Sequence, residues 1–237
     1  MEQPELFVFA GPNGAGKSTL SALMVPPGTP IFDGDKEFIL LKKQFQGLDS
    51  GDLYDAVNGH IFSDWKDDMQ RSRRTCAFET NFNNTDVMKS VDGFKQKDFA
   101  TRLIFFGLDD LALSVERVKL RVLKGGHDVS FDNIKANFEQ GLSNLQKYYS
   151  AFDQVILLKS ASEEAGQKIS VYLKLENGKI KEQGQHLPNW VDGIVHDISH
   201  RLAKEKDLNQ SRQRSRSEGF KRDDDPGLSI GSSGIKR

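Results

Sequence analysis

An eight-residue loop that directly follows a short apolar run constrains this chain more than any other feature. Residues 5–10 (ELFVFA) are apolar and end at Gly11, as a buried parallel strand does. The residues that follow, Gly11-Pro12-Asn13-Gly14-Ala15-Gly16-Lys17-Ser18, match the pattern G-x-x-x-x-G-K-[ST] in full. A glycine-rich turn with Lys17 on the surface is the alternative, and it accounts for neither this context nor the extra glycine Gly14.

The chemistry of this pattern indicates a nucleotide site. Backbone N–H groups converge on the phosphates, the lysine ammonium neutralises the β- and γ-phosphates, and the serine hydroxyl ligates Mg²⁺. We therefore predict binding of ATP and Mg²⁺, with Ser18 as the metal ligand. The predicted nucleotide-binding residues are Gly11, Pro12, Asn13, Gly14, Ala15, Gly16, Lys17, Ser18 and Thr19.

Strands and helices alternate over residues 5–158, which predicts an open, mainly parallel sheet with helices on both faces, the P-loop NTPase type of α/β fold. An Asn-Gly pair at 177–178, between alternating runs at 169–175 and 179–183, predicts a C-terminal β-hairpin, and a last helix is expected over 188–204. The other predicted strands are 30–32, 75–78, 101–106 and 154–158. The other helices are expected after Gly16, after a cap at Asn84 or Thr85, and over about 36–46, 52–73, 109–123 and 130–149, the last capped by Ser130.

Charge and composition divide the chain of 237 residues into a body and a tail. Residues 204–237 carry a net charge of +3 and five clearly apolar residues, so we expect a disordered polar tail after a kinase domain over 1–203. The body has a net charge of −4, which disfavours a protein that covers nucleic acid. With a single cysteine, no signal peptide and no long apolar run, we expect a cytoplasmic protein without a membrane segment.

Carboxylates follow two of the predicted strands. Asp33-Gly34-Asp35 follows the second strand and Glu79-Thr80-Asn81 the third, and the carboxyl ends of parallel strands face one crevice. A kinase for hydroxyl substrates needs a carboxylate that accepts the hydroxyl proton. Asp35 is our candidate base, with Asp33 as the first alternative, and either residue also suits a helix cap. We predict that Glu79 binds hydroxyl or amide groups of the substrate.

A basic helix supplies candidate arginines. Arg117, Arg121 and Lys124 lie near one helical face, and Gly125-Gly126 follows as a hinge. Arginines on such a lid can bridge the phosphates during transfer, so we predict catalytic roles for Arg117 and Arg121 beside Lys17 and Asp35. A solvated basic face is the alternative.

Together these segments resemble the zeta-toxin family of P-loop kinases, in its shorter zeta-like ATPase branch. The resemblance covers residues 4–200 and is carried by GPNGAGKST, IFDGDK, AFETNF, RVKLRVLKGGHDVSFDNIKANF and LPNWV. It implies an ATP-dependent phosphotransferase that acts on the 3′-hydroxyl of UDP-N-acetylglucosamine and is restrained by a small antitoxin protein. It also implies that Lys17 is the phosphate-loop lysine and Asp35 the general base. The resemblance further implies that Glu79, with Thr80 and Asn81 beside it, binds the sugar nucleotide.

One position departs from the family pattern. Relatives commonly carry an arginine before the aromatic residue of the helix that follows the lid, and this chain has Asn137 before Phe138. Lys135 is a partial substitute, because an ammonium does not reproduce a bidentate guanidinium. Two other functions therefore stay open. One is a kinase for polynucleotide ends, suggested by the Arg-Ser tail, and the other is a catalytically weak, nucleotide-dependent binding module.

Overall fold

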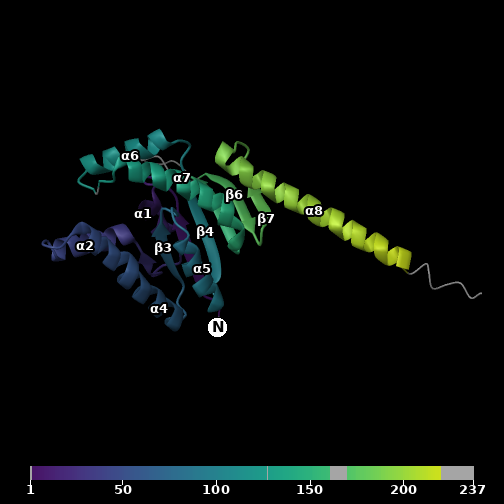
Figure 1. Ribbon diagram of the computed structural model, residues 1–237, viewed down its shortest axis with the longest axis horizontal. Helices are drawn as coiled ribbons and strands as arrows, with labels where there is room; N and C mark the ends of the chain where they lie inside the picture. The colour runs from purple at the N-terminus through teal and green to yellow at the C-terminus, as the bar shows by residue number, and fades with distance from the viewer. Residues whose placement is uncertain (1, 127, 161–169, 220–237) are drawn as a thin grey trace, which may run out of the picture. The chain divides into compact units, whose positions relative to one another are not determined.

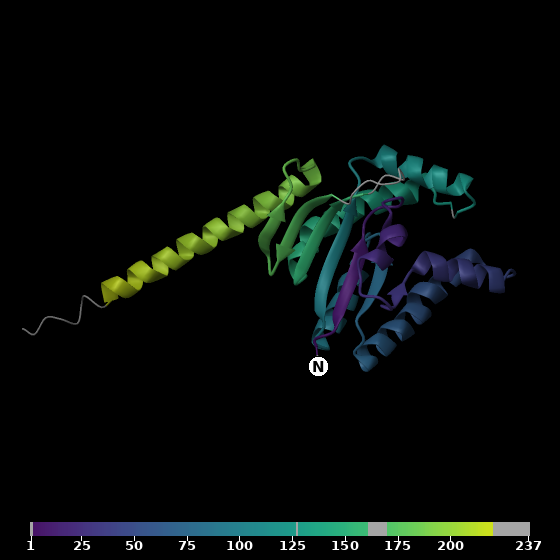
Figure 2. The same ribbon diagram turned by 180° about the vertical axis from the view of Figure 1, so that it is seen from behind.

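The computed structural model describes residues 2–126, 128–160 and 170–219, which belong to two compact units, Met1–Ile194 and Val195–Arg237. Within the described residues, strands form one sheet in the order β2-β3-β1-β4-β5-β6-β7 (Figures 1 and 2). The strands from β2 to β5 are parallel, and β6 and β7 add an antiparallel hairpin to β5. The strands are β1 (Glu5–Ala10), β2 (Ile31–Phe32), β3 (Cys76–Thr80), β4 (Ala100–Gly107), β5 (Gln154–Lys159), β6 (Val171–Glu176) and β7 (Lys179–Gln183).

Helices connect the parallel strands and surround the sheet (Figure 1). They are α1 (Lys17–Leu20), α2 (Gly34–Gln44), α3 (Ser50–Asp55), α4 (Phe62–Ser72), α5 (Asp86–Gln96), α6 (Leu111–Leu123), α7 (Phe131–Tyr148) and α8 (Asn189–Gly219). Short 3-10 turns cover Ser21–Leu23 and Tyr149–Ala151, and a π-helix covers Ala56–Ile61. The predicted α/β architecture with a C-terminal hairpin and helix is confirmed.

Both faces of the sheet are covered, as the apolar strand sequences indicate. Along β1, Phe7 and Phe9 lie on one face and Leu6, Val8 and Ala10 on the other, and all five side chains are buried. Neighbouring parallel strands keep their carboxyl ends at one edge of the sheet, where the polar loops after β1, β2 and β3 emerge. This arrangement places the predicted site residues of all three loops at one edge.

Two expectations about helices differ from the structure. The helix expected over 52–73 is divided into α3, the π-helix and α4, and Asn58 Nδ2 donates to the Tyr54 carbonyl at 2.9 Å beside this irregular turn. The last helix continues past residue 204 to Gly219, through a Ser- and Arg-rich segment in which Arg, Glu, Gln and Lys are residues that favour helix. The remaining tail, residues 220–237, lies outside the described residues, as does Ile169, where we expected the hairpin to begin.

No helix within the described part of the chain combines the length and the apolar character that crossing a membrane requires.

Candidate nucleotide and phosphotransfer site

The loop between β1 and α1 has a backbone that only glycine adopts without strain at three points, Gly11, Gly14 and Gly16. Gly11 has φ of 140°, and a Cβ there would lie 2.4 Å from the carbonyl oxygen of Phe106. Gly14 has φ of 74°, and a Cβ there would lie 2.8 Å from Cβ of Arg117. The loop therefore packs closely against β4 and α6. The close approach to α6 explains Gly14, a glycine that the pattern G-x-x-x-x-G-K-[ST] does not require.

Three successive carbonyls of this loop are held by side chains from outside it. Ser114 Oγ donates to the Asn13 carbonyl at 2.6 Å, Arg117 Nη1 donates to the Gly14 carbonyl at 3.2 Å, and Ser160 Oγ donates to the Ala15 carbonyl at 2.8 Å. Arg117 also donates to the Ser160 hydroxyl. With its carbonyls fixed to α6 and to the end of β5, the loop keeps its N–H groups available for an anion.

Lys17 lies inside this loop. Its ammonium donates to the carbonyls of Gly11 and Pro12 at 2.7 and 3.1 Å and to Asn81 Oδ1 at 3.0 Å. Burial lowers the pKa of Lys17 to about 8, although the carboxylates of Glu79 and Asp35 act in the opposite direction. A buried ammonium held mainly by neutral oxygens is poised to exchange them for phosphate.

Glu79 lies against the start of α1. Its carboxylate accepts hydrogen bonds from the Ser18 hydroxyl at 2.5 Å and from the Ser21 hydroxyl at 2.8 Å. Burial raises the pKa of Glu79, and the Ser18 hydrogen bond opposes that shift. Because the Ser18 proton points to Glu79, the oxygen lone pairs are left for a cation, and Mg²⁺ is commonly held by one carboxylate, a hydroxyl and substrate phosphates. The donor set therefore fits the predicted Mg²⁺.

The two aspartates after β2 have different partners. Asp33 caps α2, since its Oδ1 accepts from the backbone N–H groups of Asp35 and Lys36 at 3.1 and 3.2 Å, and its Oδ2 pairs with the Lys36 ammonium. Asp35 is the second residue of the same helix and lines the cavity. Its charge acts on Lys17 and, after burial, contributes to the raised pKa of Tyr54. The cap is thus Asp33, which leaves the Asp35 carboxylate facing the cavity.

The two predicted catalytic arginines also occupy different surroundings. Arg117 also lines the cavity, but its Nη1 donates to the Gly14 carbonyl of the phosphate loop and to the Ser160 hydroxyl. In Arg121, Nε and Nη2 are buried without a hydrogen-bond partner among the described residues, and the side chain lines the cavity. Arg121 is therefore the arginine with donors available to a ligand, and both catalytic roles remain predictions.

One cavity of about 830 Å³ brings these groups together, a volume that suits a nucleotide-sized ligand. Lys17, Ser18, Thr19, Asp35 and Glu79 line it, as do Thr80 and Asn81, so the residues predicted at three strand ends meet in space. Thr80 shapes the turn, since its hydroxyl accepts from the Phe82 N–H at 3.0 Å.

Sequence reasoning did not identify several residues of this cavity. Its lining also includes Tyr54, Asn58, Asn83, Asn84 and Asn133, together with Asn137, which the sequence had marked only as a departure from the family pattern. The repeated asparagines directly after the third strand (Asn81, Asn83, Asn84) were a visible signal. Tyr54 lies just before the π-helix and Asn58 lies within it, and such an irregularity is frequent at functional sites but has no clear sequence pattern.

Solved structures share this fold at low sequence identity. The toxin–antitoxin structure PezAT of Streptococcus pneumoniae matches with a TM-score of 0.55 and 16% identity, over 86% of this chain and 88% of that one. The AvrRxo1-ORF1:-ORF2 structure with ATP matches with a TM-score of 0.58 and 14% identity, over 76% of this chain and 60% of that one. A chain of the Pnkp1/Rnl/Hen1 RNA repair complex matches with a TM-score of 0.51 and 15% identity, over 62% of this chain and 47% of that one.

These similarities define the chain by its fold, which is an α/β fold of the P-loop NTPase type. No family model matches the sequence. Among curated proteins, an uncharacterized protein of Haemophilus influenzae is 22% identical over 144 residues, which are 57% of this chain and 94% of the relative.

Proposed function

We propose that the protein is an ATP- and Mg²⁺-dependent kinase that phosphorylates a hydroxyl group of a small molecule, with a nucleotide sugar such as UDP-N-acetylglucosamine as the first candidate. The observation that carries the proposal is the convergence of Lys17, Glu79-bound Ser18 and Asp35 in one cavity. ATP occupies the loop in this proposal, and the remaining wall with Tyr54, Asn83 and Asn133 receives the acceptor. The fold shared with an ATP-bound structure supports the choice of nucleotide.

Each residue has a role in the proposed transfer. Lys17 exchanges its carbonyl contacts for the β- and γ-phosphates, and Arg121 donates to the oxygens of the transferred phosphoryl group. Asp35 accepts the proton of the acceptor hydroxyl and orients its oxygen towards phosphorus. Bound Mg²⁺ supplies positive charge to the phosphate oxygens, and Ser18 and Glu79 hold its place.

The direct test is transfer of labelled phosphate from ATP to a panel of nucleotide sugars. Transfer to one sugar nucleotide would identify the acceptor. Failure with every compound, by a folded protein that binds ATP, would contradict the proposed substrate class and favour the nucleotide-dependent binding module. A 5′-hydroxyl RNA oligomer belongs in the same panel, because the fold similarity to a chain of the RNA repair complex favours a polynucleotide-end kinase as the second candidate.

A pair of matched variants tests the base. Asp35→Asn removes the proton acceptor and keeps the shape, so turnover should fall by about 10²–10⁴-fold while ATP affinity changes little. Asp33→Asn is the control, because asparagine also caps helices and Lys36, the ion-pair partner of Asp33, is largely exposed. A large loss for Asp33→Asn with normal turnover for Asp35→Asn would assign the base to Asp33.

A lysine variant tests whether phosphotransfer underlies any effect on cells. Lys17→Ala should abolish transfer without unfolding the domain, because the side chain ends in a polar site and its removal leaves no apolar cavity. If expression of the wild-type protein arrests growth, Lys17→Ala at equal protein level should restore colony formation. Arrest that persists would contradict phosphotransfer as its cause. A small antitoxin partner, like the one in the PezAT system, is part of the same proposal.

A further inference from the structure

A chain of three asparagine side chains joins the phosphate loop to the loop after β3. Asn137, on α7, donates from Nδ2 to Asn13 Oδ1 at 2.8 Å and accepts at Oδ1 from Asn83 Nδ2 at 2.6 Å. Asn13 and Asn137 are 4% and 8% exposed, so both amides depend on these bonds. We call Asn13, Asn137 and Asn83 the amide bridge.

The bridge requires a residue that both donates and accepts. An amide provides both functions within one short side chain, whereas the guanidinium of arginine and the ammonium of lysine only donate. An arginine at 137 would therefore lose the bond that Asn83 donates. Asn137 is consistent with a bridging role at this position and not with a weakened arginine.

The loop that the bridge reaches is fixed in an uncommon conformation. Phe82 is fully buried with φ of 57°, a left-handed conformation that is rare for a bulky residue. Asn144 Nδ2 donates to the Phe82 carbonyl at 2.8 Å. α7 passes so close that a Cβ on Gly141 would lie 2.7 Å from the Asn81 carbonyl oxygen. Helix α7 thus holds residues 81–83, of which Asn81 and Asn83 line the cavity on the side proposed for the acceptor.

A second link between the two loops, from the Lys17 ammonium to Asn81, cannot persist if Lys17 turns towards phosphate. A movement of Lys17 does not break the amide bridge, because the bridge contacts the phosphate loop through the Asn13 side chain and not through Lys17. With nucleotide bound, the bridge is the direct side-chain link between the two loops within the described residues.

We infer that Asn137, within the kinase function proposed above, is a positioning residue that holds the acceptor loop (residues 81–84) in register with the phosphate loop. Order that a nucleotide imposes on the phosphate loop then reaches the acceptor loop through the amide bridge. A displacement of about 1 Å between reacting groups can cost about 10²-fold in rate, so the register of these two loops matters for in-line transfer.

Hydrogen exchange of the full-length protein with ATP·Mg²⁺ as the probe tests this inference without any acceptor. In the wild type, ATP should slow amide exchange in residues 11–18 and also in 81–84. Asn137→Leu keeps a similar size and removes both bonds, so ATP should protect 11–18 and no longer 81–84. Gln140→Leu is the matched control, because Gln140 lies on α7 with an exposed side chain, and it should behave as the wild type.

Asn83→Ala breaks the bridge at its less buried end and gives the same readout if Asn137→Leu does not fold. Wild-type protection of 81–84 in a folded bridge variant, or no ATP-dependent protection there in the wild type, would overturn the inference. With an active acceptor, Asn137→Leu should lower kcat by about 10- to 100-fold and leave KM for ATP within about threefold. Equal loss in both parameters would indicate a role in nucleotide binding instead. Absence of transfer to every acceptor would contradict the kinase function and leave the exchange result intact.

Discussion

The three carboxylates at the ends of β2 and β3 are chemically alike, but their different hydrogen-bond partners suit them to different roles. Asp33 caps α2 with one oxygen and pairs with Lys36 through the other. Glu79 is half-buried and accepts hydrogen bonds from two hydroxyls, and its partial burial raises its pKa. Asp35 lines the cavity beside them. Of the three, Asp35 has the surroundings expected of a group that must accept a proton from a bound substrate.

The lowered pKa of Lys17 predicts that ATP binding takes up protons in mildly alkaline solution. Burial lowers that pKa to about 8, so in the protein without ATP more than half of the Lys17 side chains are neutral at about pH 8.5. Bound phosphates favour the ammonium and raise the pKa. ATP affinity should therefore fall as the pH rises above about 8. Calorimetry at about pH 8.5 in buffers of different ionisation heat should show uptake of a fraction of a proton.

Lys17→Arg is the control for this titration, because a guanidinium stays protonated throughout. It should bind ATP without proton uptake at about pH 8.5. The same uptake in Lys17→Arg as in the wild type would mean that a group other than Lys17 titrates.

At the scale of elements, local patterns were predictable and long-range pairs were not. The phosphate loop, β1 and the Ser130 cap of α7 depend on residues close in sequence, and each is where we expected it. In the amide bridge, Asn137 is separated in sequence from Asn83 by 54 positions and from Asn13 by 124 positions. Hydrophobic periodicity cannot predict contacts between residues so far apart. The division of residues 52–73 at the π-helix was missed for a similar reason, since the apolar spacing continues across it.

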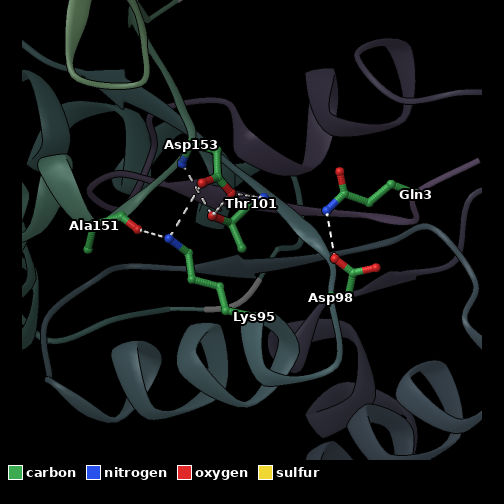
Figure 3. A network of polar contacts seen from close by, with 6 residues as sticks. All are labelled: Gln3, Lys95, Asp98, Thr101, Ala151 and Asp153. Atoms are coloured by element: carbon green, nitrogen blue, oxygen red, sulfur yellow. Dashed lines mark hydrogen bonds and ion pairs between the residues drawn. The ribbon is translucent and has the colours of Figure 1, made fainter.

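At the end of the sheet away from the site, we expect Asp153 to stabilise the fold. Asp153, just before β5, accepts from the buried Thr101 N–H and hydroxyl at 2.7 and 2.8 Å, and Lys95 donates to the nearby Ala151 carbonyl (Figure 3). Asp153→Ala should lower the free energy of unfolding by about 1–3 kcal/mol, because two buried donors lose their acceptor. Urea unfolding measures the loss. Asp98→Asn is the exposed control and should change it by less than about 0.5 kcal/mol, because asparagine also tolerates the left-handed backbone of residue 98.

The pH dependence of this difference has a defined sign. Burial acts to raise the pKa of Asp153, but the hydrogen bonds from Thr101 and the charge of Lys95 outweigh it and lower the pKa. The carboxylate therefore stabilises the fold above its unfolded pKa, and this contribution is lost as the pH falls through the folded value. The difference between wild type and Asp153→Ala should shrink in acid. A constant difference would show that the charge of Asp153 has no part in it.

At the scale of the whole molecule, the site belongs to one part of the chain. Every described residue that lines the 830 Å³ cavity lies between Asn13 and Asn137, and the strands after β5 only extend the sheet. The described side chains from Lys204 to Ser211 are exposed. The Arg-Ser sequence of the C-terminal segment and its net charge of +3 distinguish it from the acidic body.

A chain that ends at residue 203 should therefore fold and bind ATP with a dissociation constant within about twofold of the full-length value. Its affinity for an RNA oligomer should also equal that of the full chain at about 0.15 M salt, because surface charges are strongly screened there and a net charge of +3 is small. Filter binding over a series of salt concentrations measures both the affinity and its salt slope. Weaker RNA binding and a smaller slope for the shortened chain would assign the segment to nucleic acid and favour the polynucleotide-end kinase. Loss of ATP binding would instead show that residues beyond 203 support the site.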